Sequence, residues 1–242
     1  MDSLVSATDV MEAPRVIPAR SIVEAAYGTI RHDILNGTLA PGTKLRFEML
    51  RQRYRVGAST LREALTRLVG EALVTSEEQR GFRVAPISLE DFADLTAMRK
   101  MLEVEAMRQS IQLGDDAWEA ALVAAFHRLS KVEEKLRDNP NGHQEEWETR
   151  NREFHLALIA ACPSRWLKHM HAILYQQAER YRRIALGNPV VPRDIHAEHR
   201  ALHEAALARD VDLACLLGAR HIDRTVQVLN RVLAAAAAAR TP

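Results

Sequence analysis

The sequence predicts a mainly α-helical protein, in which a small N-terminal winged helix-turn-helix is followed by an all-helical bundle. Three observations support this fold class. Aromatic residues make up 5% of the 242 residues while alanine is abundant, and this composition favours helices over strand-rich sandwiches. Apolar residues recur at helical spacing over most of the chain. The two short extended stretches, Leu73–Ser76 and Gly81–Ala85, both lie within the first 85 residues.

The N-terminal end is predicted to hold an arm and a first helix. Residues 1–20 lack hydrophobic periodicity and contain two prolines, so we expect a flexible arm there. A helix is predicted over Ser21–Asn36, with Ser21 as its N-cap. Gly37 is expected to end this helix in a left-handed conformation.

A helix-turn-helix and a hairpin are predicted next, which gives a first domain over residues 21–87. A short helix is expected over Phe47–Tyr54 and a second over Ser59–Glu71, separated by Val56-Gly57-Ala58. The two extended stretches that follow form a hairpin whose tip is the charged segment Glu77–Arg80.

From residue 88 onward the pattern is helical throughout, and we expect a second domain over residues 88–239. Glycines, prolines and capping residues separate the predicted helices, with Ser164 and Asp210 as plausible N-caps. The six amphipathic segments are Ser88–Leu113, Asp115–Asp138, Gln144–Cys162, Ser164–Leu186, Ile195–Ala208 and Asp210–Ala239. They predict a bundle of six or seven helices.

Charge is concentrated in the predicted helix-turn-helix. The whole chain has a net charge of only +1, so it is not a general polycation. Between Lys44 and Arg67, however, seven basic residues stand against two acidic ones, a local net charge of +5. Such an excess is typical of a surface that binds phosphate. A merely solvated helical face is the alternative, but the order of helix, turn, helix and charged hairpin favours DNA.

The second helix of such a pair presents its N-terminal residues to the major groove. Small hydroxyls at Ser59 and Thr60 allow close approach, and Arg62 can reach guanine or phosphate. The residues that we expect to contact DNA are Arg46, Arg51, Arg53, Ser59, Thr60, Arg62, Arg67 and Arg83.

Three histidines of the helical half lie on inward, apolar helix faces. Asn151 and His155 are neighbours on one such stripe, and His199 and His221 lie on two others. Each is more often a hydrogen-bonded core residue when taken alone, but three that converge could bind a divalent metal such as zinc or nickel. His196 and His203 are possible substitutes for His199.

Arg99 also falls on an apolar stripe and could bind a carboxylate through two hydrogen bonds. An ion pair with Glu103, four residues on, is the alternative with equal weight. The two cysteines, Cys162 and Cys215, are far apart in the sequence, and no signal peptide or membrane-spanning segment is evident. We therefore expect a cytoplasmic protein.

The N-terminal motifs resemble the GntR family of bacterial regulators. The resemblance rests on three ordered blocks: Ile30-Arg31-His32-Asp33-Ile34-Leu35-Asn36-Gly37 with Pro41-Gly42, then Leu61-Arg62-Glu63-Ala64-Leu65 with Arg67-Leu68, and Gly81-Phe82-Arg83-Val84. The helical remainder is similar to the FadR-type ligand-binding domain. The second helix of the helix-turn-helix, which begins at Ser59, is similar to that of the carbon-starvation-induced regulator branch. Two departures are Gly57-Ala58, where many relatives carry Ser-Arg, and Glu48, where some carry an arginine.

The resemblance implies a metal site and an effector. Many FadR-type members bind metal through an Asp-x-x-x-His pair and two later histidines, which correspond here to Asn151, His155, His199 and His221. The amide of Asn151 replaces a carboxylate and is a weaker ligand. An arginine at the place of Arg99 faces the effector pocket in relatives.

These observations predict a transcriptional repressor and not an enzyme, because no common catalytic motif is present. We expect a homodimer that binds palindromic double-stranded operator DNA and responds to a small organic acid. A metal-dependent enzyme on the helical bundle, or a constitutive DNA-binding dimer without an effector, are the alternatives.

Overall fold

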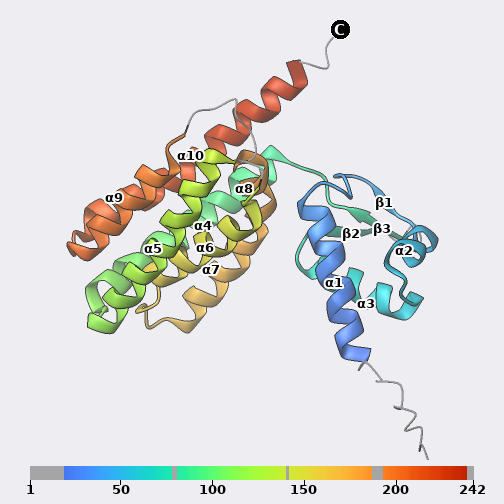
Figure 1. Ribbon diagram of the computed structural model, residues 1–242, viewed down its shortest axis with the longest axis horizontal. Helices are drawn as coiled ribbons and strands as arrows, with labels where there is room; N and C mark the ends of the chain where they lie inside the picture. The colour runs from blue at the N-terminus through green and yellow to red at the C-terminus, as the bar shows by residue number, and fades with distance from the viewer. Residues whose placement is uncertain (1–18, 78–80, 140–141, 187–192, 239–242) are drawn as a thin grey trace, which may run out of the picture.

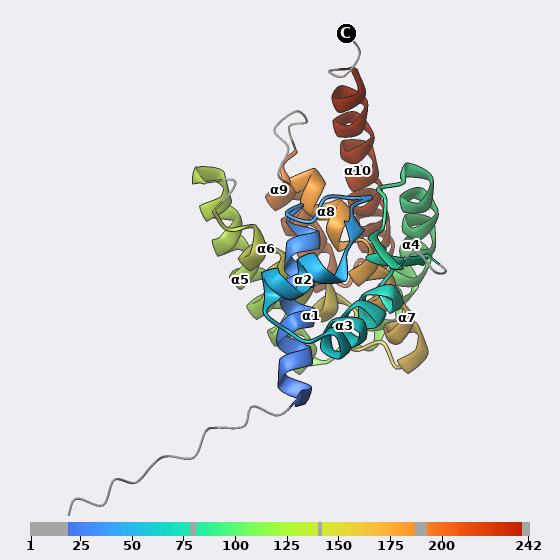
Figure 2. The ribbon, with the colours of Figure 1, turned by 90° about the vertical axis from the view of Figure 1, so that its right-hand side faces the viewer.

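The computed structural model describes residues 19–77, 81–139, 142–186 and 193–238, and it has the predicted mainly helical architecture. Figure 1 shows a small N-terminal unit, made of α1 to α3 with a sheet, beside a helical domain made of α4 to α10. In the view of Figure 2 the N-terminal unit lies in front, with α2 and α3 on the side turned away from the helical domain. No helix in the described ranges combines the length and hydrophobicity that crossing a bilayer requires.

The N-terminal unit is a winged helix-turn-helix. Its helices are α1 (Ala19–Leu35), α2 (Phe47–Tyr54) and α3 (Ala58–Gly70), and its strands are β1 (Lys44–Leu45), β2 (Val74–Glu77) and β3 (Gly81–Val84). The strands pair antiparallel in the order β1-β3-β2. Leu50, Leu61 and Leu65 are fully buried among the helices, because their apolar spacing places them on the inward faces.

Two sequence predictions are corrected in this unit. The first helix begins at Ala19, so Ser21 lies inside it and is not its N-cap. The strand β1 was not predicted, because two residues are too short to show an alternating pattern. Gly37 has φ 76°, as predicted for a left-handed helix end. Residues 1–18 of the expected arm and residues 78–80 of the hairpin tip lie outside the described residues.

The helical domain contains seven helices in the described residues. They are α4 (Leu89–Leu113), α5 (Asp116–Asp138), α6 (Gln144–Leu158), α7 (Arg165–Gln177), α8 (Glu179–Leu186), α9 (Ile195–Leu207) and α10 (Val211–Ala238). Its main core is centred on Leu122, Phe154 and Leu202. The predicted N-caps are confirmed, because Ser164 accepts a hydrogen bond from the backbone N–H of Leu167 and Asp210 one from that of Leu213.

Two predicted helices end elsewhere in the structure. The helix expected to reach Cys162 ends at Leu158, and tight turns lead from there to Pro163, whose ring disfavours helical geometry in the residue before it. The segment expected as one helix over 164–186 is two helices that meet at Ala178. Alanine is a good helix former, so local preference could not reveal this break.

Helices α4 and α10 pack closely in antiparallel orientation. Lys100 pairs with Asp223 near one end of the contact, and Arg108 pairs with Asp212 near the other. Gly218 of α10 faces Met107 of α4, and a Cβ atom at position 218 would lie 2.5 Å from the Met107 methyl carbon. The absence of a side chain at position 218 therefore leaves room for the Met107 side chain against α10.

Candidate metal centre and DNA-binding surface

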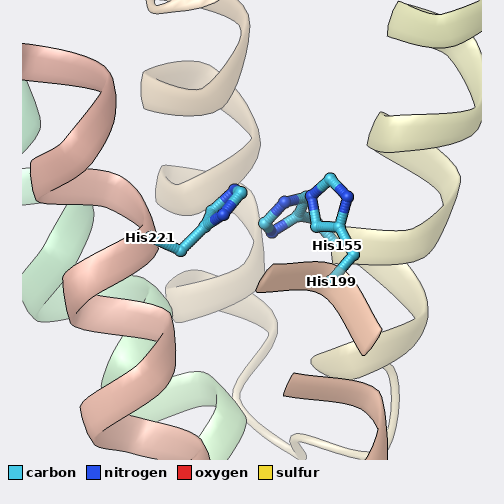
Figure 3. A group of neighbouring side chains, drawn as sticks. All are labelled: His155, His199 and His221. Carbon is cyan, nitrogen blue, oxygen red and sulfur yellow. The ribbon is translucent and has the colours of Figure 1, made fainter. Parts of the chain in front are cut away.

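Three histidines from three helices converge inside the helical domain (Figure 3). His155 lies on α6, His199 on α9 and His221 on α10, and one ring nitrogen of each lies within 4.8 Å of the other two. His155 and His199 are buried, and His221 is nearly so. The structure therefore brings together the three histidines that the sequence singled out.

A buried glutamate orients each of these histidines through its Nδ1 atom. The pairs, with their nitrogen–oxygen distances, are His155 with Glu103 at 2.7 Å, His199 with Glu133 at 2.6 Å and His221 with Glu198 at 2.8 Å. A carboxylate can only accept, so Nδ1 carries the proton and the Nε2 lone pair is left for a ligand. The Nε2 atoms of His155 and His199 are buried and have no hydrogen-bond partner among the described residues.

The charges of this cluster favour neutral histidines beside ionised glutamates. Burial lowers the pKa of His155 to about 4, and burial likewise holds the pKa of His221 well below its usual value. Burial raises the pKa of Glu133, but the hydrogen bonds from His199 and His196 outweigh it, and the net direction is downward. At neutral pH His155 and His221 are thus unprotonated, which is the form of imidazole that binds metal.

Asn151 lies one helical turn before His155 and is also buried. Its Nδ2 atom donates to the Tyr175 hydroxyl at 2.7 Å, while its Oδ1 atom is buried without a partner within the described part of the chain. Unpaired buried acceptors are costly unless something binds them. The three convergent imidazole nitrogens are a donor set that divalent metals bind, and carboxylate–histidine pairs support such binding. The Asn151 oxygen as a further ligand, and zinc or nickel as the metal, remain predictions.

The two substitute histidines lie apart from this group. His196 contacts Glu133 at 2.8 Å and its other ring nitrogen contacts Arg200. His203 stacks on Phe126 with ring centroids 4.3 Å apart. Neither belongs to the convergent set found in the described residues.

Arg99 is buried beside the histidines and pairs with Glu103, from which its Nε atom lies 2.9 Å away. Its guanidinium also lies 4.5 Å from the centre of the Tyr175 ring. The ion pair that the sequence offered as the alternative is therefore present. A contact between Arg99 and an effector remains a prediction.

Sequence reasoning missed several buried groups around the site. His171 of α7 is fully buried, and its Nε2 atom lies 3.0 Å from Glu103, which it shares with His155. Glu133 sits next to Val132 on the inward stripe of α5, so its position among apolar neighbours was a usable signal. The partnership of each glutamate with a histidine from another helix left no local signal, because it depends on tertiary packing.

The start of α3 forms the centre of the candidate DNA-binding surface. Ser59 and Arg62 are exposed and Thr60 is partly exposed, while Gly57 precedes the helix without a side-chain cap in the described structure. The first-turn N–H groups of α3 are therefore open to a phosphate oxygen. The Arg62 guanidinium lies 5.5 Å from the centre of the Phe47 ring, which places it beside the start of α2.

The other arginines that are predicted to contact DNA differ in their partners within the protein. Arg46 is exposed at the N-cap of α2, and Arg51 makes a loose contact with Glu48 at 3.8 Å. The remaining three have closer partners in the N-terminal unit: Arg53 pairs with Asp33 at 2.9 Å, Arg67 with Glu24 at 2.7 Å, and Arg83 donates to the carbonyl of Gly42 at 2.6 Å. Their contacts with DNA remain predictions.

Comparison with protein families identifies both halves of the chain. Residues 22–84 match the model of bacterial regulatory proteins of the gntR family, and residues 94–224 match the model of the FCD domain. The second match covers more than half of the chain.

Comparison with individual proteins agrees. The uncharacterized HTH-type transcriptional regulator BphR of Paraburkholderia xenovorans is 45% identical over 88% of this chain and 86% of its own length. The HTH-type transcriptional repressor GlaR of Escherichia coli is 36% identical over 86% of this chain and 96% of its own. Both relatives regulate transcription, in agreement with the expectation that the chain is not an enzyme.

A crystal structure of a GntR family regulator from Pseudomonas syringae covers 93% of this chain and 91% of its own, with 27% identity and a TM-score of 0.53. A second structure, a putative GntR regulator from a Rhodococcus species, covers 87% of this chain and 98% of its own at 21% identity, with a TM-score of 0.67. The second likeness concerns the fold alone.

Proposed function

Because this chain belongs to the GntR family of bacterial transcriptional regulators and carries an FCD domain, we propose that it is a repressor controlled by a small organic acid. The acid would bind beside a divalent metal in the helical domain and change the affinity of the winged helix for its operator. The proposal includes the predicted domain limits, 21–87 and 88–239.

The convergence of His155, His199 and His221 carries this proposal. Two of their Nε2 atoms are buried without a partner among the described residues, which would be an unexplained cost in a purely structural core. Together with the Asn151 oxygen, they would hold zinc or nickel. A divalent ion held there supplies a positive charge and an open coordination position for a carboxylate oxygen.

Residues of the chain would complete the recognition of the acid. Arg99 is joined to His155 through Glu103, which contacts both residues, and its planar guanidinium suits a carboxylate. Glu103 holds this guanidinium in place from one side, and the Tyr175 ring packs on it. The carboxylate of an acid bound here would either replace Glu103 as the partner of Arg99 or bind Arg99 alongside Glu103. In both cases the Arg99 guanidinium would compensate the negative charge of the acid.

The DNA-binding half would act as a pair. A single small winged helix covers little DNA, whereas a homodimer reads two half-sites of a palindrome. The acid would shift the population between arrangements in which the two α3 helices match or miss the half-site spacing. The similarity to GlaR, which is itself a transcriptional repressor, supports repression over activation for this chain.

A binding titration tests this function. Purified protein is analysed for zinc and nickel, and its affinity for the duplex upstream of its own gene is measured against a panel of mono- and dicarboxylic acids. We expect about one metal ion per chain and a change in DNA affinity of at least several-fold with one class of acid. If DNA affinity is unchanged by every acid, and His199→Ala alters neither metal content nor DNA binding, the chain is a constitutive DNA-binding protein instead.

A further inference from the structure

Helix α8 contacts the DNA-binding unit directly and is joined to the metal centre through Tyr175. Although it is only eight residues long, several of its ionisable side chains are buried, among them Glu179, Arg180, Arg182 and Arg183. Burial of so many charges is costly unless each has a fixed partner. Their partners belong to different parts of the chain, which indicates a role for α8 beyond packing.

One group of contacts joins α8 to the metal centre. Asn151 donates to the Tyr175 hydroxyl at 2.7 Å, and the Tyr175 ring lies 4.0 Å from the Arg182 guanidinium carbon. Arg182 also donates to the Tyr175 carbonyl at 2.9 Å and forms a buried ion pair with Glu148. A displacement of Asn151 would therefore be felt by Tyr175 and by the Arg182 side chain of α8.

A second group joins α8 to the N-terminal unit. Glu179 accepts a hydrogen bond from Arg31 of α1 at 2.5 Å. Arg183 donates to Asn36, directly after α1, at 3.2 Å. Arg180 donates to the carbonyls of the segment between the two halves of the chain, those of Ala85 at 3.0 Å and Pro86 at 2.5 Å.

Arg31 extends this link to the helix that would read DNA. Its Nε atom donates to Glu71, the residue that follows α3, at 3.1 Å, while its Nη2 atom binds Glu179. A single guanidinium thus joins the C-terminal end of α3 to α8. The opposite end of α3 presents Ser59 and Arg62.

We propose that the Arg31–Glu179 ion pair transmits the state of the metal centre to α3. This inference rests on the proposed function and names the contact through which regulation would act. Metal or acid bound at Asn151 and the histidines changes how Tyr175 and Arg182 are held. The resulting shift of α8 moves Glu179 and, through Arg31, the orientation of α3. Such a contact provides a contiguous physical connection between the two sites.

The test compares operator affinity in zinc-loaded and chelator-treated protein, so that the metal alone is the probe. The ratio of the two dissociation constants is measured for the unmodified protein, for Glu179→Gln and for Arg31→Gln. Coupling between sites in proteins typically changes affinity roughly 5- to 150-fold. We expect a ratio in that range for the unmodified protein and a ratio near one for both variants.

The matched control is Glu119→Gln. Glu119 forms an ion pair with Arg209 at the same nitrogen–oxygen distance, 2.5 Å, but within the helical domain and away from α8. This variant should keep the ratio of the unmodified protein. In the double variant Glu179→Gln/Arg31→Gln the ratio should change no further, because both substitutions remove the same contact. A ratio that survives Glu179→Gln overturns the inference.

Hydrogen exchange of α1 separates this inference from the proposed function. Zinc should slow exchange over residues 26–35 of the unmodified protein and have little effect there in Glu179→Gln. If the protein binds no DNA but zinc still slows hydrogen exchange in α1, the proposed function is wrong, while the coupling through the Arg31–Glu179 ion pair is supported. If DNA binds but zinc changes neither DNA affinity nor α1 exchange, the inference fails alone.

Discussion

The Nδ1 atom of His199 lies 2.6 Å from Oε1 of Glu133, and both side chains are buried. The carboxylate fixes the proton on Nδ1 and turns Nε2 toward the other two histidines. Glu133 is not one of the three convergent residues, but its hydrogen bond to Nδ1 leaves Nε2 as the nitrogen of His199 that can bind a ligand. Carboxylates in this position commonly raise both the basicity and the order of a metal-ligating histidine.

We therefore expect Glu133→Gln to weaken zinc binding about 10- to 100-fold, measured by competition with a chromogenic chelator. The amide can still accept a hydrogen bond, but it lacks the negative charge that supports the metal-bound imidazole. Glu134→Gln is the matched control, because Glu134 is the exposed neighbour on the same helix. Equal zinc affinity in the two variants would contradict the role assigned to Glu133.

Replacing Asn151 by aspartate should tighten zinc binding by about one order of magnitude. A carboxylate adds a negative charge where the amide offers only a neutral oxygen, and hard or borderline cations favour it. The same variant exchanges the hydrogen bond to Tyr175, because the tyrosine hydroxyl must then donate. Isothermal titration with zinc measures the change, and unaltered or weaker binding would show that Asn151 is not a ligand.

Arg62→Ala should weaken operator binding because Arg62 is exposed at the start of α3. A lost contact with a base edge costs about 1–3 kcal/mol and relaxes sequence preference at one position. A lost phosphate contact instead lowers the slope of log affinity against log salt by about one. Fluorescence anisotropy at several salt concentrations distinguishes the two, with the exposed Arg137→Ala of α5 as the control.

The contribution of Glu179 to stability should depend on pH. Burial raises the pKa of Glu179, but the Arg31 and Arg183 guanidinium groups outweigh it and bring the pKa below its usual value. A carboxylate whose pKa is lowered by folding stabilises the protein above its unfolded pKa, and this contribution disappears as the pH falls through the folded value.

Glu179→Gln should accordingly lower the thermal unfolding midpoint by several degrees between pH 5 and 7, for a loss of ~2 kcal/mol. The difference between the two proteins should shrink as the pH falls below about 4.5. Calorimetry of both proteins over this pH range provides the measurement. A difference that grows in acid would mean that the carboxyl group is protonated in the native state.

The sequence was sufficient for the overall architecture because hydrophobic spacing and capping residues carry most of that information. The helix over 47–54 and the N-caps Ser164 and Asp210 followed from local patterns, and the structure contains them. The break at Ala178 could not be predicted, because alanine favours helix and nothing in the local sequence marks that position.

The candidate site was predictable only in part. The inward faces of His155, His199 and His221 could be found from helical spacing, and the structure brings these residues together. The glutamate partners of the histidines could not be predicted, because Glu103 and Glu198 lie on helices whose placement relative to the histidines no pattern in a single sequence reveals. Burial of a glutamate among apolar residues was the strongest signal that was left unused.

The contact between Gly218 of α10 and Met107 of α4 lies close to the histidine cluster along both helices. Met107 lies one turn after Glu103, and Gly218 lies one turn before His221. A side chain at position 218 would therefore force the end of the Met107 side chain to move, next to the residues that hold the histidine cluster. Met107 is thus seated by a residue that supplies no ligand and has no side chain of its own.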